Sequence, residues 1–371
     1  MLKTLTDARH TIHRNPERGF NEVKTISLIS TMLNRVPLLM KVGTGRVYEI
    51  MSDSTKIVTR RIALRCELDA LPSTETSNVD WKSTISGTHH GCGHDGHMAI
   101  MIGTALSLWD SRFLIPDGYA VRIIFQPAEE GLGGARPMIE AGCLNGVDEI
   151  YGLHNWQGEF GVISVCPGPL MAHATHFKIT VQGCGGHGST PERTIDPIVA
   201  AAAVIGSLQN IVSRNISSSD RAVITVATIS GGETHNVIPN LVTMTGTTRD
   251  FSVEVFEVMK NRMKEVVDGI CEAYGCVGTL VFDEGYPVVV NTRADFVTDS
   301  LTDKGYIVSD RNLPIMGGED FSFYLNKIPG CFFLLGNDMD IPCHNSNYDF
   351  NDDLIPIGIN IWLTLVKSWC E

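Results

Sequence analysis

The spacing of apolar positions changes twice along the chain and divides it into three stretches. In the first stretch, apolar runs with polar residues at their ends alternate with segments of helical periodicity. The runs RRIALRCEL, AVRIIFQ and EIYGLH predict strands, and MAIMIGTALSLW and GGARPMIEAG predict helices. Residues 1–35 also have helical periodicity, with a break at Asn15-Pro16. This β-α-β rhythm is typical of a mostly parallel sheet covered by helices, in which ligands bind at the carboxyl ends of the strands.

The rhythm changes near residue 173. Strand HATHFKITVQG, helix DPIVAAAAVIGSLQNIVSR, two strands, a second helix and strand VGTLVFDEG follow in the order β-α-β-β-α-β, which is typical of a ferredoxin-like unit. After residue 285 the strand CFFLLG and a final helix, IPIGINIWLTLVKSW, restore the first pattern. We predict an α/β catalytic domain (residues 1–172 and 285–371) with helices on both faces of its sheet, split by an inserted ferredoxin-like α+β domain (residues 173–284).

Composition and charge narrow the range of partners. The chain has 371 residues, of which 43% are hydrophobic and 19% charged, as in ordinary globular proteins. Its 29 Lys and Arg against 42 Asp and Glu give a net charge of −13, which disfavours nucleic acids and anionic membranes as partners. The longest uncharged stretch, Pro197 to Ser213, contains many small and polar residues and predicts a buried amphipathic helix rather than a membrane span.

The amino-terminal residues and the cysteines bear on the compartment. MLKTLTDARHTIHRNPE carries charges where a secretory signal needs an apolar core, so we expect a cytoplasmic protein. The ten cysteines are scattered and form no CxxC pair, which favours reduced thiols. A cysteine that lies near histidines is a candidate metal ligand.

One such cysteine lies in the motif HGCGHDGH, immediately before a predicted helix. His90, Cys92, His94, Asp95 and His97 are crowded into this segment, and its glycines allow sharp backbone turns. Thiol, imidazole and carboxylate donors together suit Zn²⁺, Co²⁺, Ni²⁺ or Mn²⁺ better than Ca²⁺ or Mg²⁺. A histidine-rich surface loop or a redox-active cysteine is the alternative interpretation.

Further candidate donors lie at strand ends or in loops of the same predicted domain. Glu129 and Glu130 are adjacent in FQPAEEG, His154 ends the next predicted strand in GLHNW, and His344 lies in IPCHNSNYDF. Adjacent carboxylates are often merely solvated and a lone histidine is often structural, but their convergence on one domain favours a shared site. One carboxylate would bind metal while its neighbour takes a proton from activated water, which is the chemistry of a hydrolase.

These residues resemble the dinuclear-metal amidohydrolase branch of the aminoacylase/carboxypeptidase clan, which includes hippurate hydrolases and indole-3-acetyl-amino-acid hydrolases. The resemblance runs nearly end to end through ordered blocks: RHTIHRNPERGFNE, ALRCELDALPSTE, HGCGHDGHMA, FQPAEEGLGGARPMIEAG, GLHNW, GCGGHGSTP, THNVIPN, GTTRDF, MGGEDFSFY and HNSNYDFND.

The resemblance implies two divalent metal ions (Zn, Mn, Co or Ni) and a role for each matching residue. The implied metal ligands are Cys92, His94, Glu130, His154 and His344. Glu129 matches the general acid/base and Asp69 the acid that orients the site. His187, in the inserted domain, matches a histidine that stabilises the tetrahedral oxyanion. Asn236 and Arg249 match substrate-binding positions, although a turn asparagine and a surface arginine would look the same.

The implied activity is hydrolysis of the amide bond of small N-acyl-amino acids to a carboxylic acid and a free amino acid. A metallo-carboxypeptidase or dipeptidase that acts on peptide bonds is the alternative within enzymes, and a non-catalytic metal-binding protein or a redox sensor is the alternative outside them. The inserted domain also suggests a homodimer. Two positions depart from the family: Glu67 stands where Asp is usual, and Glu192 follows a proline where many relatives have His.

Overall fold

The computed structural model describes residues 1–371 and divides them into two compact units, each with its own core. Unit 1 comprises Met1–Leu170, Val289–Pro314 and Asp320–Glu371, and unit 2 comprises Met171–Val288 and Ile315–Glu319. The short segment 315–319 belongs to unit 2 because it pairs with the start of that unit: Ala172 N donates to Gly317 O at 2.8 Å. The sequence analysis placed the inserted domain at residues 173–284.

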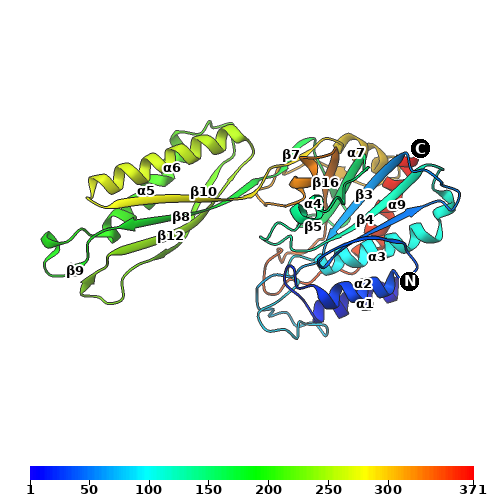
Figure 1. The fold of residues 1–371 in the computed structure, drawn as a ribbon, viewed down its shortest axis with the longest axis horizontal. Coiled ribbons are helices and arrows are strands. Elements are labelled where there is room, and N and C mark those ends of the chain that lie inside the picture. The colour runs from blue at the N-terminus through cyan, green and yellow to red at the C-terminus, as the bar shows by residue number, and fades with distance from the viewer. The chain divides into compact units, whose positions relative to one another are not determined.

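Unit 1 contains most of the helices and one large sheet (Figure 1). Its helices are α1 (Leu2–Arg14), α2 (Val23–Met32), α3 (His94–Asp110), η1 (Arg112–Leu114), α4 (Ala135–Glu140), α7 (Ala294–Thr302), α8 (Ser322–Leu325) and α9 (Leu354–Cys370). Its strands are β1 (Leu38–Val42), β2 (Gly45–Met51), β3 (Arg60–Glu67), β4 (Tyr119–Gln126), β5 (Glu149–Trp156), β6 (Ile163–Ser164), β7 (Gly168–Met171), β14 (Val289–Asn291), β15 (Val308–Ser309) and β16 (Gly330–Gly336).

The eight-stranded sheet of unit 1 has the order β1-β2-β4-β3-β5-β16-β6-β15. Its four central strands, β4, β3, β5 and β16, run parallel, while β1, β2 and β6 add antiparallel pairs. Strands β3, β4 and β16 are buried along most of their length, as expected for parallel strands covered by helices. The predicted mostly parallel α/β sheet is confirmed.

Helix α3 is the central helix of unit 1. It packs against α1 and α9, so the first and the last helix of the chain both contact it (Figure 1). Most of α3 is buried, including its first four residues, His94 to His97. The sequence predicted a helix after HGCGHDGH, but the structure starts it inside the motif, at His94. This placement carries the second half of the motif into the interior.

Unit 2 is a four-stranded antiparallel sheet with two long helices (Figure 1). Its elements are β8 (His173–Gln182), β9 (Gly186–His187), η2 (Pro191–Arg193), α5 (Pro197–Arg214), β10 (Val223–Ser230), β11 (Val237–Ile238), β12 (Leu241–Asp250), α6 (Val253–Ala273) and β13 (Val277–Tyr286). The sheet order β10-β12-β8-β13 with α5 and α6 packed together gives the predicted ferredoxin-like arrangement.

Helix α5 begins where the sequence predicts, because Asp196 accepts a hydrogen bond from Ile198 N at 2.9 Å and Pro197 occupies the first turn. By length and composition α5 is also apolar enough to cross a membrane. One side of it, with Ala200, Val204 and Leu208, is buried in the core of unit 2. The buried residues make up 33% of the helix.

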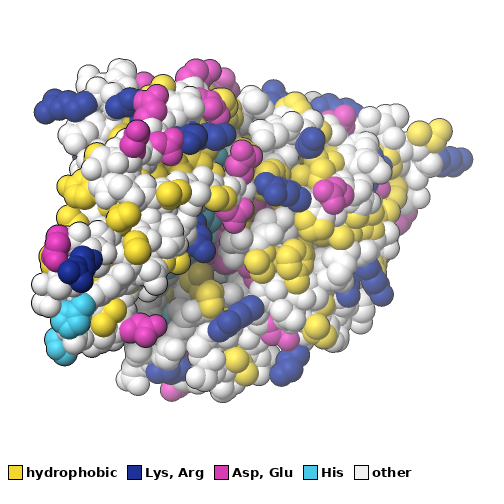
Figure 2. Space-filling model, turned by 60° about the vertical axis from the view of Figure 1, so that its left-hand side comes forward, with side chains coloured by type: hydrophobic (Ala, Val, Ile, Leu, Met, Phe, Trp, Pro, Cys, Tyr) yellow, Lys and Arg dark blue, Asp and Glu magenta, His cyan; other side chains and the backbone are white.

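The surface agrees with the acidic composition. On the face drawn in Figure 2, Lys and Arg side chains stand singly among acidic and apolar ones. All ten cysteines are free thiols.

Candidate metal and catalytic site

The candidate site lies at the carboxyl ends of the four parallel strands of unit 1. Asp69 follows β3, Glu129 and Glu130 follow β4, and His154 lies near the end of β5. His344 lies in the loop after β16, and HGCGHDGH brings Cys92 and His94 to the start of α3. The structure therefore brings together all the residues that the sequence analysis placed in the catalytic domain.

Glycine allows the Cys92 segment to approach β5. Gly93 has a left-handed φ of 86°, and a β-carbon on it would lie 2.1 Å from Asn155 Oδ1. No other residue fits this position, because any β-carbon there would overlap Asn155. The close approach places Cys92 Sγ 3.3 Å from His154 Nε2.

His94 is oriented by one nitrogen and leaves the other available. Its Nδ1 lies 2.8 Å from the backbone oxygen of Asp69 and donates to it. Its Nε2 is buried, makes no hydrogen bond, and lies 4.0 Å from Glu129 Oε2. Burial opposes the charged imidazole, but Asp69, Glu67 and Glu130 outweigh it and raise the pKa of His94 to about 10. The surrounding carboxylates thus create a strong local preference for positive charge.

Glu129 and Glu130 lie on a strained turn that two buried acids hold in place. Ala128 has a left-handed φ of 54°, which costs free energy for a residue with a β-carbon. Glu22 accepts a hydrogen bond from the backbone N–H of Ala128 at 2.9 Å. Asp69 accepts from the N–H groups of Glu129 and Glu130 at 3.0 and 2.9 Å. Strain that is held in this way marks a position fixed for function.

His344, near the carboxyl end of the chain, is the last of the candidate ligands. Its Nε2 lies 3.4 Å from Glu130 Oε1, and its backbone N–H donates to Gly91 O at 2.7 Å. It also has a left-handed φ, of 70°. The interaction with Glu130 outweighs burial and raises the pKa of His344. The loop after β16 is thus bonded directly to the HGCGHDGH segment.

The donor atoms are close enough to hold metal ions. Potential ligand atoms lie within 4.8 Å of one another in several groups: Cys92 with His94 and His154, Cys92 with Glu130 and His344, and His94 with Glu129 and Glu130. The unpartnered, buried Nε2 of His94 fits a bound cation better than an empty interior, since buried polar atoms normally have partners. Thiol, imidazole and carboxylate donors in overlapping groups fit two divalent transition-metal ions.

His97 supports the site and is not free to bind metal. Its Nδ1 lies 2.8 Å from Glu67 Oε2 and donates to it, and its Nε2 accepts the backbone N–H of Asn155 at 3.0 Å. His97 therefore fixes the backbone next to His154. Glu67 also pairs with the buried Arg65, which reaches Asp320 at 2.6 Å. The sequence analysis noted Glu67 only as a departure from the family, and its link to His97 follows from the fold.

A second buried network lies behind the HGCGHDGH segment and was not predicted. Arg9 and His13 of α1 contact Asp95 at 3.0 and 2.8 Å, and His13 Nε2 lies 3.3 Å from Glu75. Burial opposes the charge on His13, but Asp95 and Glu75 raise its pKa to about 9. His90, also of the motif, is buried with neither ring nitrogen hydrogen-bonded. The only sequence signal was Asp95 itself, because the partners lie far away in the chain.

His187 and Asn236 lie in unit 2 and are neighbours there. β9 pairs with β11, and Gly188 N donates to Asn236 O at 2.8 Å. Nδ1 of the exposed His187 accepts the backbone N–H of Ser189 at 3.1 Å. Its other nitrogen, Nε2, therefore carries the proton of the neutral ring and is available as a hydrogen-bond donor. Glu192, in η2, is exposed.

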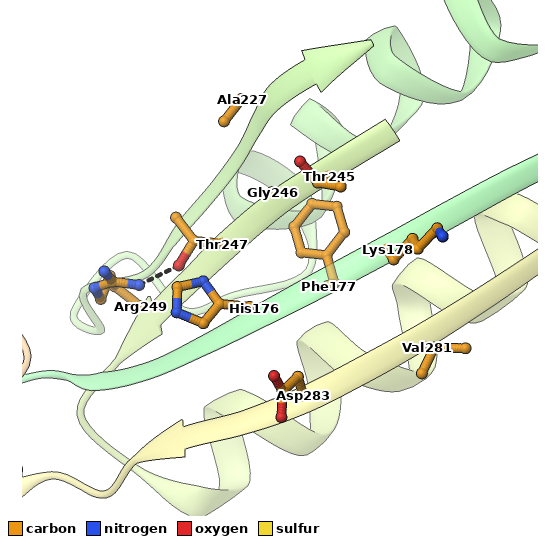
Figure 3. A pocket seen from close by; sticks show the side chains of 10 residues that line it. All are labelled: His176, Phe177, Lys178, Ala227, Thr245, Gly246, Thr247, Arg249, Val281 and Asp283. Carbon is orange, nitrogen blue, oxygen red and sulfur yellow. Dashed lines mark hydrogen bonds between the residues drawn. The ribbon is translucent and has the colours of Figure 1, made fainter. Parts of the chain in front are cut away.

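Arg249 lies at the opposite end of the sheet of unit 2 from β9. It pairs with Ala174, whereas Leu241, at the other end of β12, pairs with Gln182. Arg249 donates to Thr248 O at 2.8 Å and to the Thr247 hydroxyl (Figure 3). Burial lowers the pKa of its guanidinium. The structure therefore separates Arg249 from His187 and Asn236 by about 25 Å of strand.

Arg249 lines a shallow hollow of about 550 Å³ on the open face of this sheet (Figure 3). His176, Lys178 and Asp283 are the other ionisable residues in its wall. Two of the lining residues are basic and permanently charged, against one acid. The hollow suits a small anionic group, such as a carboxylate, better than a cation.

Comparisons with known proteins agree with this site. Residues 63–368 match the model of peptidase family M20/M25/M40. The "Thermostable carboxypeptidase 2" of Saccharolobus solfataricus is 38% identical, over 94% of this chain and 91% of its own length. The N-acetylcysteine deacetylase of Bacillus subtilis is 37% identical, over 95% and 93%. A solved dinuclear metal-binding peptidase of the M20 family from Bacillus subtilis has a TM-score of 0.83 at 33% identity, with 99% and 98% of the two chains covered.

The family model covers most of the chain, and relatives above 30% identity span nearly all of it. The matched residues 63–368 include the cluster of potential metal-ligating side chains at the strand ends of unit 1. The chain is therefore a metal-dependent hydrolase of peptidase family M20/M25/M40, in its amidohydrolase branch.

Proposed function

We propose that this enzyme hydrolyses the amide bond of small N-acyl-amino acids to a carboxylic acid and a free amino acid. The observation that carries the proposal is the pair of carboxylates on the turn after β4. Glu130 belongs to both donor groups, the one with Cys92 and His344 and the one with His94 and Glu129. Glu129, its neighbour, is buried and lies 4.0 Å from His94 Nε2. This arrangement supports a division of roles in which Glu130 holds metal and Glu129 acts as the base.

We assign the metal positions to Cys92, His94, Glu130, His154 and His344. Two divalent ions bound there, from among Zn, Mn, Co and Ni, would polarise the amide carbonyl and lower the pKa of water. Glu129 takes the proton of the attacking water and delivers it to the leaving nitrogen, so that the amine departs neutral. Asp69 keeps Glu129 in place through the two backbone hydrogen bonds of the turn.

We assign oxyanion stabilisation to His187 and substrate binding to Asn236 and Arg249. Nε2–H of His187 is oriented as a donor by Ser189, which is the group needed as the carbonyl oxygen gains charge. The guanidinium of Arg249, at the edge of the hollow in unit 2, suits the free carboxylate of an amino-acid product or substrate.

The separation within unit 2 favours a homodimer. An N-acyl-amino acid is much shorter than the roughly 25 Å of strand between Arg249 and β9. A single small substrate therefore cannot contact Arg249 and His187 of the same unit 2. In a homodimer, two copies of unit 2 supply one of these residues each to a given site. The exposed edge strand β10, with Ile229 53% exposed, offers an unpaired sheet edge for such an assembly.

A metallo-carboxypeptidase or dipeptidase activity is the second candidate. It is supported by the relative named thermostable carboxypeptidase, which is as similar to this chain as the deacetylase is. Both reactions need the same metal donors and the same base, and both can use Arg249 to bind a carboxylate. They differ in what lies on the acyl side of the scissile bond: a simple acyl group or an amino-acid residue.

A matched substrate panel separates the two activities. The purified enzyme, stripped of metal and reloaded separately with Zn²⁺, Mn²⁺, Co²⁺ or Ni²⁺, is assayed by amine release with N-acetyl-, N-benzoyl- and indole-acetyl-amino acids and with the corresponding dipeptides. We expect kcat/KM to be highest for an N-acyl-amino acid, and Glu129→Gln to abolish that turnover. Higher kcat/KM for dipeptides with every metal would establish the second candidate, and no amine release from either class would refute both.

A further inference from the structure

A second thiol lies beside the candidate ligand Cys92. Cys343 Sγ lies 3.9 Å from the backbone oxygen of Cys92. Asn155 Nδ2 lies 3.5 Å from the same sulfur. The sequence analysis gave no role to Cys343, and nothing in the proposed hydrolysis uses it.

The backbone holds these two cysteines together. His344 N donates to Gly91 O at 2.7 Å, so the peptide group that follows Cys343 lies against the one that precedes Cys92. The left-handed conformations of Gly93 and His344 fix the two loops on either side of the contact. A disulfide needs its two α-carbons about 4.4–6.8 Å apart, and this hydrogen bond brings the two loops together one residue away from each cysteine.

The two sulfurs differ in their access to solvent. Cys92 is buried, with 8% of its surface exposed, whereas Cys343 is partly exposed and follows an exposed proline, Pro342. A small oxidant that enters from solvent therefore meets Cys343 first. Cys92 is the more buried of the two and would be the sulfur that resolves the first oxidation product.

We propose that Cys92 and Cys343 are a modification site: a hydroperoxide oxidises them to a reversible disulfide that withdraws Cys92 from the metal site. The Cys343 thiol is oxidised to a sulfenic acid while the peroxide O–O bond breaks and one molecule of water (from hydrogen peroxide) leaves. The Cys92 thiol attacks this sulfur, the S–S bond forms, and the sulfenic oxygen leaves as a second water. The two sulfurs together lose two electrons, which reduce the peroxide. A dithiol reverses the reaction by exchange.

The proposal makes metal binding and oxidation mutually exclusive at Cys92. A sulfur bound in a disulfide has no thiolate to offer a metal, and a metal-bound thiolate is shielded from the sulfenic acid. Only the metal-free form should react. At a free metal concentration about ten times the dissociation constant, disulfide formation should therefore slow by about tenfold. This coupling rests on Cys92 being a metal ligand, but not on which amide the enzyme hydrolyses.

The test is disulfide mapping with metal release as a second readout. The full-length enzyme, loaded with Zn²⁺ and separately stripped of it, is treated with hydrogen peroxide, alkylated without reduction, digested and analysed by mass spectrometry, while released zinc is followed with a chromogenic chelator. We expect a peptide pair joined through Cys92 and Cys343, and we expect it to form faster in the stripped enzyme. The zinc-loaded enzyme should lose zinc on oxidation. Treatment with dithiothreitol, followed by fresh Zn²⁺, should restore the bound zinc.

Two variants serve as controls. Cys343→Ser should abolish the crosslink and the reversibility, so that Cys92 oxidises irreversibly. Cys184→Ser removes a more exposed thiol, in unit 2, and should leave the crosslink and its rate unchanged. Oxidation of Cys92 or Cys343 without a joined peptide, or a crosslink that forms equally fast with zinc and leaves zinc bound, would overturn the proposal. Neither readout depends on turnover, so its failure is distinguishable from failure of the proposed amidase function.

Discussion

The carboxylate of Asp69 accepts a hydrogen bond from the backbone N–H of Glu129 at 3.0 Å. Its second oxygen accepts from the next N–H, and its backbone oxygen accepts from His94 Nδ1 at 2.8 Å. One residue at the end of β3 thereby fixes both the turn that carries the base and a candidate metal ligand.

We predict that Asp69→Asn weakens the site without removing any candidate ligand. An asparagine amide presents an N–H₂ group to one of the two backbone N–H donors, so the turn must shift. Loss of such supporting contacts typically costs about 10–100-fold in metal affinity or activity. The metal dissociation constants, measured by competition with a chelator, should rise, and kcat should fall. A variant with wild-type affinity and wild-type kcat would show that Asp69 has no orienting role.

Glu129→Gln tests the base directly. The substitution keeps the shape of the side chain but removes its ability to accept a proton, so kcat should fall by about 10²–10⁴-fold or to the detection limit. Elemental analysis should give the same metal content as for the wild type, because Glu129 is not assigned as a ligand. Persistent turnover in a metal-loaded variant would mean that another group acts as the base.

The metal stoichiometry should be two ions per chain, because Cys92, His94, Glu130, His154 and His344 are too many ligands for one tetrahedral ion. Cys92→Ala should lower the affinity for at least one of them. Since thiol and imidazole ligands must lose a proton to bind, metal loading should fall as the pH is lowered. Elemental analysis across a metal titration checks both points, and saturation at one ion per chain would contradict the two-metal site.

His187→Ala should lower kcat by about 10²–10³-fold with metal content unchanged and KM altered much less, as for loss of an oxyanion donor. A histidine that only caps its strand would instead lower the thermal midpoint and leave kcat nearly normal. Mixing this variant with Glu129→Gln under conditions that exchange subunits adds a second measurement. Activity regained in the mixture would mean that His187 acts on the partner's site, whereas an inactive mixture with proven hybrid dimers would place it in its own.

His13 should make folding stability depend on pH. Its pKa is raised to about 9, because Asp95 and Glu75 outweigh the effect of burial. A raised pKa stabilises the fold fully below the unfolded value of about 6.5, and this stabilisation is lost as the pH rises through about 9. The loss of thermal midpoint caused by His13→Gln should therefore be large at pH 6 and shrink above pH 9.

This measurement needs excess chelator, so that metal loading does not vary with pH. The charged and titratable groups that face His13 are Arg9, Asp95, Glu75, His89 and Asp349. The pKa of Arg9 is raised and those of Asp95, Glu75 and His89 are lowered, away from the range between pH 6.5 and 9. A His13→Gln effect that does not vary with pH would contradict the charged imidazole.

The parts of the fold that depend on local pattern could be predicted from the sequence. Apolar runs located β3, β4 and β5, helical periodicity located α3, and strand-end polarity located Glu129 and His154. The hairpin of β1 and β2 was not predicted, because Leu38 and Leu39 are exposed on a sheet edge and break the expected alternation. The link from Asp95 to His13, across 82 residues, depends on how α1 packs against α3. Local periodicity contains no information about such pairs.

Among the residues of HGCGHDGH, sequence alone could not separate ligands from supports. His94 and His97 lie on the same side of α3, one turn apart, and both are buried. What distinguishes them is that Glu67 and the backbone of Asn155 occupy both nitrogens of His97, whereas one nitrogen of His94 is left without a partner. That difference is a property of the neighbouring strands, so it appears only once β3 and β5 are in place.

The position of β16 next to β5 has a consequence for how the enzyme matures in the cell. All of unit 2 is translated between these two neighbouring strands. A nascent chain that has already exposed Cys92, His94, Glu130 and His154 still lacks the strand that covers β5 and the histidine that follows it. His344 lies in the last tenth of the chain. The full set of five proposed metal ligands therefore exists only after more than nine tenths of the chain has been made.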